Sequence, residues 1–312
     1  MNTEKFDFYS PTSLKSYNLE QTIRYQLDIL GNLDLFTRRH SENVANLTCR
    51  ICEYLHLGKR FTVYCTTCAY LHDIGKMFIP LEILQKPDRL TDEEFEIMKT
   101  HTTLGYEMCM KDLKLRPYAK GALYHHEALN GTGYPNGLTK KDIPYEAQII
   151  RVADEYDAIV TKRHYKTHVN ISDTLKDLIQ DTKPDPKFVA LDHLAEISKV
   201  GKISKIILRT LFKVVIDDVL YEISCVTGYL DYLKEQIKRL ELMKDYKEKM
   251  EKSDKEKTKN YYLSGINMLL QPDETIENFE TILNEYYEAL EVRQQRIKDL
   301  HNEIKIIKKL KV

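Results

Sequence analysis

Five histidines and two aspartates stand in an order that could bind metal ions: His40, His72, Asp73, His101, His125, His126 and Asp154. Imidazoles and carboxylates are donors that borderline divalent metals accept, and one carboxylate can bridge two ions. Asp73 follows a histidine directly and lies mid-order, so it is the expected bridge. Seven donors are too many for one ion and suit two. Because a two-metal site polarises a phosphoryl oxygen and generates hydroxide for in-line attack, the pattern indicates phosphoester hydrolysis.

Single histidines are weaker signals. His56, His193 and His301 are isolated in the sequence, which is typical of surface or hydrogen-bonded side chains. His101 taken alone would fit a helix surface as well as a metal. The order of the seven residues around an intact HDIGK segment favours metal ligands instead.

The elements that must position these side chains are helices. Apolar residues recur at helical spacing through most of the chain, and no alternating run is long enough to build a sheet. Thr91 and Glu94 predict a capping box at one helix start. The expected helices are Leu14–Leu30, His40–His56, Arg60–Leu71, Asp92–Met110, Tyr118–Ala128, Tyr145–Thr161 and Ser172–Gln180. The sequence therefore predicts an all-α protein whose bundle points the seven side chains inward.

The stretch from Asp34 to Phe188 resembles an HD-GYP domain, the bacterial branch of the HD phosphohydrolases. The matching segments are DLFTRRHS, LHDIGK, ILQKPDRLTDEEFEIMKTH, HHEALNGTGYPNGL, IIRVADEYDAI and RHYK. The resemblance covers about half of the chain and implies an HD-type helical bundle with a dinuclear metal site. It also implies a phosphodiesterase that hydrolyses cyclic di-GMP to pGpG, and often on to GMP, by attack of a metal-bridging hydroxide on phosphorus.

The resemblance also implies roles for individual residues. One ion, iron or manganese, would be held by His40, His72, Asp73 and Asp154. The other would be held by Asp73, His101, His125 and His126. Substrate phosphate would be contacted by Lys76, which stabilises developing charge together with Asp73 at the catalytic centre, and by Arg163 and Lys166.

The sequence also predicts roles for residues of the loop that follows the histidine pair. Gly131 and Gly133 permit a tight backbone there, and Pro135 stiffens it. Glu127 is expected to fix an imidazole from behind. Tyr134 is expected at the substrate, although a packed loop corner is an equally simple role. In HD-GYP proteins this loop is linked to protein partners, so a partner at this loop is a further expectation.

Three positions depart from the HD-GYP pattern. Asn130 replaces the usual aspartate, which keeps the turn preference but loses the charge. Phe36 occupies a position where some members have a glutamate that binds a third metal, so two ions are expected here. Asn43 replaces a common arginine, a change that nothing in the sequence explains.

Two other functions remain open at this stage. One is a non-catalytic receptor or scaffold that binds a cyclic dinucleotide, although no core ligand is missing. The other is hydrolysis of a different nucleotide such as cyclic GMP-AMP, because no motif reports base recognition.

Composition narrows the class of protein. The chain has 312 residues, a formal net charge of −1 and no long basic block, which argues against a nucleic-acid surface. The N-terminus lacks a signal-peptide pattern. The most apolar late segment, 203–220, is interrupted by charged residues and should not span a membrane. A cytoplasmic protein is the expectation.

Six cysteines include two Cys-x-x-Cys pairs that could form a zinc ribbon: Cys49 with Cys52, and Cys65 with Cys68. Both pairs lie within helical apolar patterns rather than on turns. Buried, reduced thiols in helix packing are therefore expected.

The chain is expected to divide into three parts. An N-terminal helical segment (1–33) precedes the HD-GYP phosphohydrolase domain (34–194). A long-helix region (195–312) follows, with apolar stripes among dense charge. Because such stripes need burial, this C-terminal region predicts a coiled-coil homodimer, with a regulatory bundle as the alternative.

Overall fold

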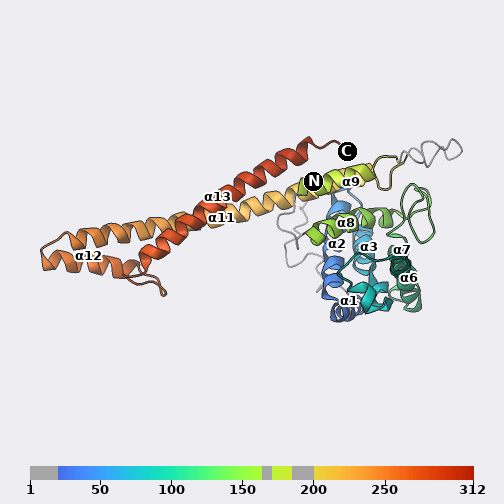
Figure 1. Cartoon of the computed structure of the whole chain (residues 1–312), viewed down its shortest axis with the longest axis horizontal. Helices are drawn as coiled ribbons and strands as arrows, with labels where there is room; N and C mark the ends of the chain where they lie inside the picture. Colours follow the sequence, from blue (N-terminus) through green and yellow to red (C-terminus); the bar gives the residue numbers. More distant parts are fainter. Residues whose placement is uncertain (1–19, 164–170, 185–199) are drawn as a thin grey trace. The chain divides into compact units, whose positions relative to one another are not determined.

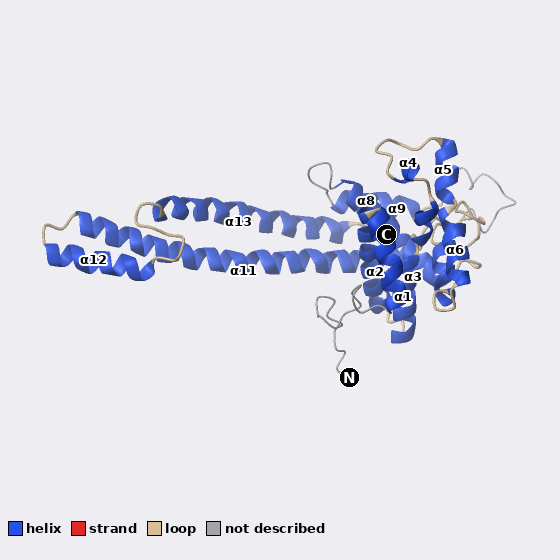
Figure 2. Ribbon diagram, turned by 90° about the horizontal axis from the view of Figure 1, so that it is seen from below, coloured by secondary structure: helices blue, strands red, loops and turns tan. Residues whose placement is uncertain are grey.

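The computed structural model describes residues 20–163, 171–184 and 200–312, and these residues form helices joined by loops (Figures 1 and 2). Within these ranges no strand forms, and one isolated bridge joins Asn130 to Thr139. The predicted all-α class is confirmed. In chain order the elements are α1 (Gln21–Leu33), α2 (Leu35–Tyr54), α3 (Lys59–Leu71), η2 (Ile74–Phe78), α4 (Leu81–Leu84), α5 (Asp92–Lys99), α6 (His101–Lys111), η3 (Arg116–Tyr118), α7 (Ala119–Tyr124), α8 (Tyr145–Arg163), α9 (Ile171–Asp181), α11 (Lys205–Glu251), α12 (Glu256–Leu269) and α13 (Phe279–Lys309).

Contacts divide the chain into two compact units. The first unit runs to Val215 and includes Lys309–Val312, and the second unit is Ile216–Lys308. Helix α11 therefore begins in the first unit and continues through the second. The division into parts at residues 33 and 194 stays a prediction.

In the first unit, α2 packs against α1, α3 and α8, while α6 packs against α7 and η2. Helix α2 begins where it does because the Asp34 carboxylate accepts hydrogen bonds from the backbone N–H groups of Phe36 and Thr37. Helix α5 begins at the predicted capping box, since the side chains of Thr91 and Glu94 each accept a hydrogen bond from the other's backbone N–H.

Most expected helices differ from the structure by a few residues at their ends, and the helix expected from His40 begins at Leu35. Two of the differences affect the site. The helix expected over Asp92–Met110 is two helices, α5 and α6, separated at Thr100. There the backbone N–H of Thr100 donates to Ile97 O three residues back, and this tighter turn redirects the chain before His101. The helix expected to reach Ala128 ends at Tyr124, so the histidine pair follows the helix rather than lying within it.

The four cysteines of the Cys-x-x-Cys pairs are buried within α2 and α3, as expected for packing residues. The contact between Cys68 and Gly121 requires a glycine at position 121. A Cβ on Gly121 of α7 would lie 2.6 Å from the Cys68 Cβ, so α3 and α7 are in close contact at this point.

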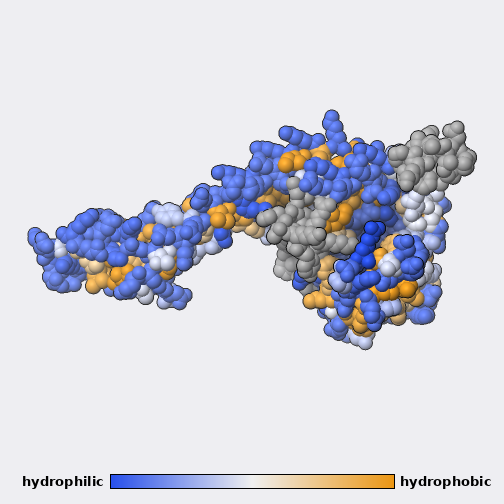
Figure 3. Space-filling view, in the orientation of Figure 1, coloured by the Kyte–Doolittle hydropathy of each residue, from blue (hydrophilic) through white to orange (hydrophobic). Residues whose placement is uncertain are grey.

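The second unit is a helical hairpin in which α11 and α13 lie side by side in both ribbon views, with α12 between them in sequence (Figures 1 and 2). Its buried core is formed by Ile237, Leu240, Met243, Ile266, Phe279 and Leu283. On the face shown in Figure 3, hydrophilic side chains cover most of this unit and an apolar strip runs along it. None of the helices in the described ranges combines the length and apolar character needed to span a bilayer.

Candidate metal centre and substrate pocket

His40 lies at the end of the apolar stripe of α2. Val44, Leu47 and Ile51 follow it at four, three and four residues, and all are buried. Residues at this spacing share one helix face, so the stripe that packs the core also turns His40 inward.

Helix α8 presents carboxylates to His40 in the same way. Ile150, Asp154 and Asp157 are buried at helical spacing. His40 Nε2 lies 2.9 Å from Asp154 Oδ1, and its Nδ1 lies 2.7 Å from Asp157 Oδ2. One imidazole is therefore held between two carboxylates, one of which was not predicted as a site residue.

His72 and Asp73 follow α3 at the turn into η2, and their position against α6 depends on Gly75. A Cβ on Gly75 would lie 1.9 Å from His101 O and 2.5 Å from the Gly105 N. Only glycine permits this approach of two backbones. The segment HDIGK therefore joins the His72–Asp73 pair directly to the helix that begins at His101.

Three of the histidines are oriented by the backbone. The Nδ1 atoms of His72, His101 and His125 lie 2.7, 2.6 and 2.9 Å from the carbonyl oxygens three residues earlier, at Ala69, Met98 and Ala122. Because a carbonyl can only accept, each Nδ1 must carry the proton. The Nε2 atom of each ring is left on the side of Asp73.

Asp73 lies at the centre of the histidines. Its Oδ1 is 3.4 Å from His101 Nε2 and 3.9 Å from His125 Nε2, while its Oδ2 is 3.3 Å from His72 Nε2 and 3.7 Å from His40 Nε2. Two groups of possible metal donors share this carboxylate, each with its donor atoms within 4.8 Å of one another: Asp73, His101, His125 and His126, and His40, His72 and Asp73.

The carboxylates are ionised at neutral pH. Burial alone would raise the pKa of Asp73, but nearby His72 and Lys76 hold it well below its usual range. The pKa of Asp154 is also lowered, since the hydrogen bond to His40 outweighs its burial.

The imidazoles differ among themselves. Burial lowers the pKa of His101, and it lowers those of His125 and His126 strongly, so these rings are neutral and can donate lone pairs. Burial also opposes the charge on His40, but its bonds to Asp154 and Asp157 prevail and raise its pKa to about 9. A cation that binds this ring must therefore displace a proton.

The residues present fit metal ions. The Nε2 of His72 and Oδ1 of Asp73 are buried without any hydrogen-bond partner. Unpartnered buried polar atoms are costly, and both atoms belong to residues of the nitrogen and oxygen donor groups around Asp73. Divalent metal ions would satisfy both atoms.

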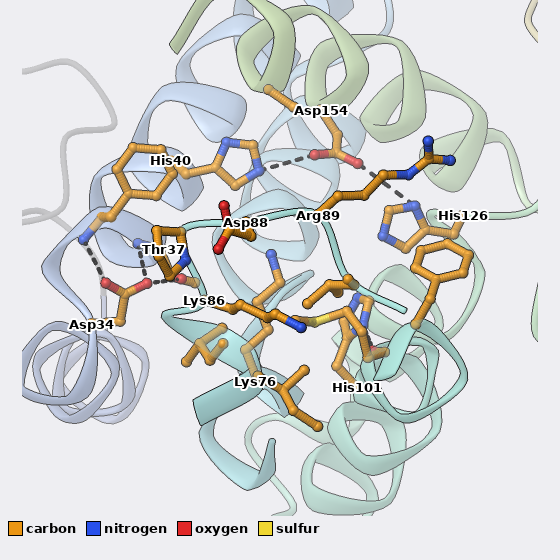
Figure 4. A pocket seen from close by; sticks show the side chains of 18 of the residues that line it. Asp34, Thr37, His40, Lys76, Lys86, Asp88, Arg89, His101, His126 and Asp154 are labelled. Carbon is orange, nitrogen blue, oxygen red and sulfur yellow. Dashed lines mark hydrogen bonds and ion pairs between the residues drawn. The ribbon is translucent and has the colours of Figure 1, made fainter. Parts of the chain in front are cut away.

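Four of the donor residues, His40, His101, His126 and Asp154, line a cavity of about 870 Å³. Figure 4 shows His40 and His126 on opposite sides of Asp154, with Lys76 directed into the space between them. The Lys76 Nζ is 2.6 Å from Asp73 Oδ2. The loop between α4 and α5 adds Lys86, Asp88 and Arg89 to the wall. The cavity thus combines a donor cluster with amines and a guanidinium that suit phosphate.

Tyr134 lines the cavity and stacks on His126, with ring centroids 4.7 Å apart and planes 25° from parallel. The peptide bond between Tyr134 and Pro135 is cis. Both expected roles of Tyr134, in the pocket wall and in the packed loop, are therefore compatible with its position.

The expected role of Glu127 is corrected by the structure. Its two carboxylate oxygens accept hydrogen bonds from the backbone N–H groups of Asn136 and Leu138, at 2.7 and 2.8 Å, and not from an imidazole. The reason is that the loop folds back over this side chain and supplies two unpaired amides. Glu127 holds the loop, and the loop holds Tyr134 against His126.

Arg151 supports the histidine pair from behind. Its guanidinium donates to His126 O at 2.7 Å and to the Glu155 carboxylate one turn along α8. Burial raises the pKa of Glu155 to about 7. Asn130 accepts bonds from Thr132 through Oδ1, which agrees with the turn preference expected of it.

Two predicted substrate contacts fall outside this geometry. Arg163 is the last residue of α8, but its side chain is not among those described, and Lys166 lies outside the described residues. Six of the seven predicted metal ligands lie in the two donor groups, and Asp154 and Lys76 contact members of these groups. The roles of all these residues, and of Arg163 and Lys166, stay predictions.

Sequence reasoning missed Asp157, Arg151, Lys86 and Arg89. Asp157 carried a usable signal, because it follows Asp154 by three residues on a helix and so shares its face. Arg89 carried no such signal, since a loop has no periodicity that reports which way a side chain points.

Known proteins are similar to this chain over about half of its length. The family model described as HD domain matches residues 25–187, just over half of the chain. A cyclic di-GMP phosphodiesterase from Thermotoga maritima is 42% identical over 158 residues, which cover 49% of this chain and 43% of that protein. A 3'3'-cGAMP-specific phosphodiesterase from Vibrio cholerae is 33% identical over 159 residues, which cover 50% of this chain and 35% of that protein. This chain thus spans less than half the length of these relatives.

Among solved structures, Bd1817, an HDG"Y"P protein from Bdellovibrio bacteriovorus, matches with a TM-score of 0.43 and 22% identity, over 62% of this chain and 60% of that one. The family model, the order of the motifs and the shared donor cluster lead to one conclusion: this chain belongs to the HD domain family.

Proposed function

We propose that this chain hydrolyses cyclic di-GMP to pGpG, and further to GMP, with two divalent ions that are iron or manganese. The observation that carries the proposal is the shared carboxylate of Asp73, which belongs to two donor groups, and both groups contribute residues to the wall of one cavity. The sequence similarity to a cyclic di-GMP phosphodiesterase over 158 residues of this chain gives the proposal its substrate.

His40, His72, Asp73 and Asp154 would hold one ion, and Asp73, His101, His125 and His126 the other. Ions bound there would polarise a phosphoryl oxygen and lower the pKa of water to supply a nucleophile. Lys76 keeps a positive charge beside Asp73, because this carboxylate raises its pKa despite burial. Its ammonium group is therefore placed to offset the charge that develops on phosphate.

The direct test is turnover of cyclic di-GMP followed by chromatography. The full chain is stripped with a chelator and reloaded with ferrous iron, manganese or magnesium in separate samples. We expect pGpG, and then GMP, only with iron or manganese, and no product from an Asp73→Ala variant. Absence of product with every metal, in protein that retains the metals, would contradict the proposal and favour a receptor without turnover.

Cyclic GMP-AMP is the second candidate substrate, because a relative that is 33% identical over 159 residues has this specificity in its name. The two nucleotides share phosphates and ring size and differ in one base. Competition between them in a single reaction gives the ratio of kcat/KM directly, and a ratio above one for cyclic GMP-AMP would reverse the preferred substrate.

The second unit is proposed to form the homodimer, because residues such as Tyr261, Met268 and Val292 expose apolar surface on it. One chain has a mass of 36.7 kDa. Light scattering of the full chain should give twice this mass at micromolar concentration. A monomeric mass would remove dimerisation and leave the regulatory alternative.

A further inference from the structure

Two phenylalanines in the wall of the cavity are exposed although the cavity is otherwise rich in charged groups. Phe36 is 42% exposed and Phe95 is 44% exposed, and both line the cavity. Single exposed apolar side chains are common on proteins. What distinguishes these two is that they come from different helices, α2 and α5, and border the same space.

Phe36 is next to the His40 side of the donor cluster. It precedes His40 by four residues in the first turn of α2, so the two side chains lie on one helix face. Its backbone N–H is tied to the Asp34 cap at 3.2 Å, which fixes this first turn. The ring therefore stands one helical turn from His40 in the cavity wall.

Phe95 is next to the His126 side. Its ring meets Tyr134 edge to face, with centroids 6.4 Å apart and planes 82° apart, and Tyr134 stacks on His126. The Lys99 ammonium lies 5.1 Å from the Phe95 ring centroid. The ring is thus held from behind by Tyr134 and Lys99, while nearly half of it stays open to solvent.

We propose that Phe36 and Phe95 are stacking platforms for the two purine bases of a cyclic dinucleotide, one base at each side of the donor cluster. The inference rests on the proposed function, because it takes the substrate phosphates to lie at the donor cluster between the two rings. A cyclic dinucleotide carries its two bases on either side of its phosphates, which matches this order of groups. Stacking on an aromatic ring accepts any base and does not depend on hydrogen-bond readout.

This assignment gives a function to Phe36, which stands where some HD-GYP proteins have a glutamate that binds a third metal. It also predicts relaxed discrimination between guanine and adenine at the two rings, since both purines present similar faces. Specificity for one nucleotide must then come from polar groups elsewhere in the wall.

The test uses Phe36→Ala and Phe95→Ala in the full chain, with Phe36→Tyr and Phe95→Tyr as variants that keep a ring. Phe78→Ala is the matched control, because Phe78 is 53% exposed and does not line the cavity. We expect each alanine variant to raise the KM for cyclic di-GMP by roughly 5- to 100-fold, with kcat changed by less than about twofold because the reacting groups remain. The tyrosine and Phe78 variants should match the wild type.

Binding is measured alongside turnover, by calorimetric titration of cyclic di-GMP into chelator-treated protein. If the wild type turns over cyclic di-GMP and the alanine variants keep its KM and Kd, the stacking proposal is overturned while the proposed function stands. If the wild type lacks turnover, the proposed function fails and Kd decides the stacking. An equal Kd in all variants, or no binding to the wild type, then overturns the stacking as well.

Discussion

Each compact unit contains a carboxylate surrounded by positive or polar partners. The carboxylate of Glu274 in the second unit has hydrogen-bond partners for both oxygens, whereas that of Asp73 in the first unit does not. In the second unit, Glu274 accepts from both terminal nitrogens of Arg239, at 2.6 and 2.5 Å, and from the Gln271 N–H at 2.9 Å. In the first unit, Asp73 is surrounded by imidazoles and still has one oxygen without a hydrogen bond.

This difference is what we expect between a carboxylate that supports the fold and one that binds a ligand. A paired carboxylate needs nothing from outside the chain, whereas an unpartnered buried oxygen costs about 1–3 kcal/mol until something binds it. Mutation of Asp73 in the first unit should therefore affect activity most, and mutation of Glu274 in the second unit should affect stability most.

The largest effect is expected for Asp73→Asn, which keeps the shape of the side chain and removes its charge. Both donor groups lose the charge of their shared carboxylate, so phosphodiesterase activity should fall by more than about 100-fold. This loss exceeds the roughly 10- to 100-fold that is usual when a residue hydrogen-bonded to a metal ligand is replaced. Activity and metal content per chain are measured together. Asp88→Asn, an exposed change in the same cavity wall, is the control, and a metal content equal to wild type would remove Asp73 from the site.

Asp157→Asn should have the next largest effect and sharpens the comparison within the first unit. His40 would lose the carboxylate that orients its Nδ1 side, and such losses lower metal affinity about 10- to 100-fold. Titration of stripped protein with manganese gives the affinity. Thermal unfolding of the same samples checks the fold, because an equal affinity with a lower Tm would mean that Asp157 supports the helices only.

Glu274→Gln breaks the matched pair of the second unit, and here stability should change while activity does not. The side chains of Arg239 and Glu274 are 15% and 5% exposed, so loss of the charge should cost about 1–2 kcal/mol after solvent screening. Hydrogen exchange of peptides from α12 and α13 reports this locally. A loss of phosphodiesterase activity would contradict the separation of roles.

The same pair gives a pH dependence with a definite sign. The hydrogen bond from Arg239 lowers the pKa of Glu274 below that of the unfolded chain, about 4.3. The ionised Glu274 therefore contributes fully to the stability of the folded state above that pH. This contribution is lost as the pH falls through the lower pKa of Glu274 in the folded chain. The wild-type second unit should lose protection below about pH 4.3 more steeply than the Glu274→Gln variant, and parallel curves would contradict this.

The smallest effect is expected for Glu127→Gln, where a matched carboxylate lies within the first unit. One of the two backbone N–H groups would face an amide nitrogen, at a cost of about 1 kcal/mol. Thermal unfolding should show a small decrease in Tm, and Glu127→Ala a larger one. An unchanged Tm for both would mean that the loop is held by other contacts.

The sequence was sufficient to predict the helical class, and six of the seven predicted ligands lie in the two donor groups, with Asp154 hydrogen-bonded to His40. Periodicity reports which helix face is buried, and His40 and Asp154 lie on such faces. The other predicted ligands were assigned from whole segments, such as HDIGK, that resemble HD-GYP proteins. The position of Lys76 in the cavity followed from the same motif.

Features that depend on tertiary geometry were not predictable. The break at Thr100 arises from a single tightened turn inside a continuous apolar pattern, so periodicity runs through it. The role of Glu127 was wrong because adjacency to a histidine in sequence does not fix which way a carboxylate turns. Arg89 entered the cavity wall from a loop, where local sequence carries no direction.

The contact at Gly75 has a mechanical consequence. Where two backbones touch without a side chain between them, the spacing of the groups they carry has almost no compliance, since neither surface can rotate away. The distance from Asp73 to His101 is then fixed by contact between peptide groups rather than by the adjustable ends of side chains. An alanine at position 75 would push the two backbones apart and increase this distance, although every predicted metal ligand would still be present.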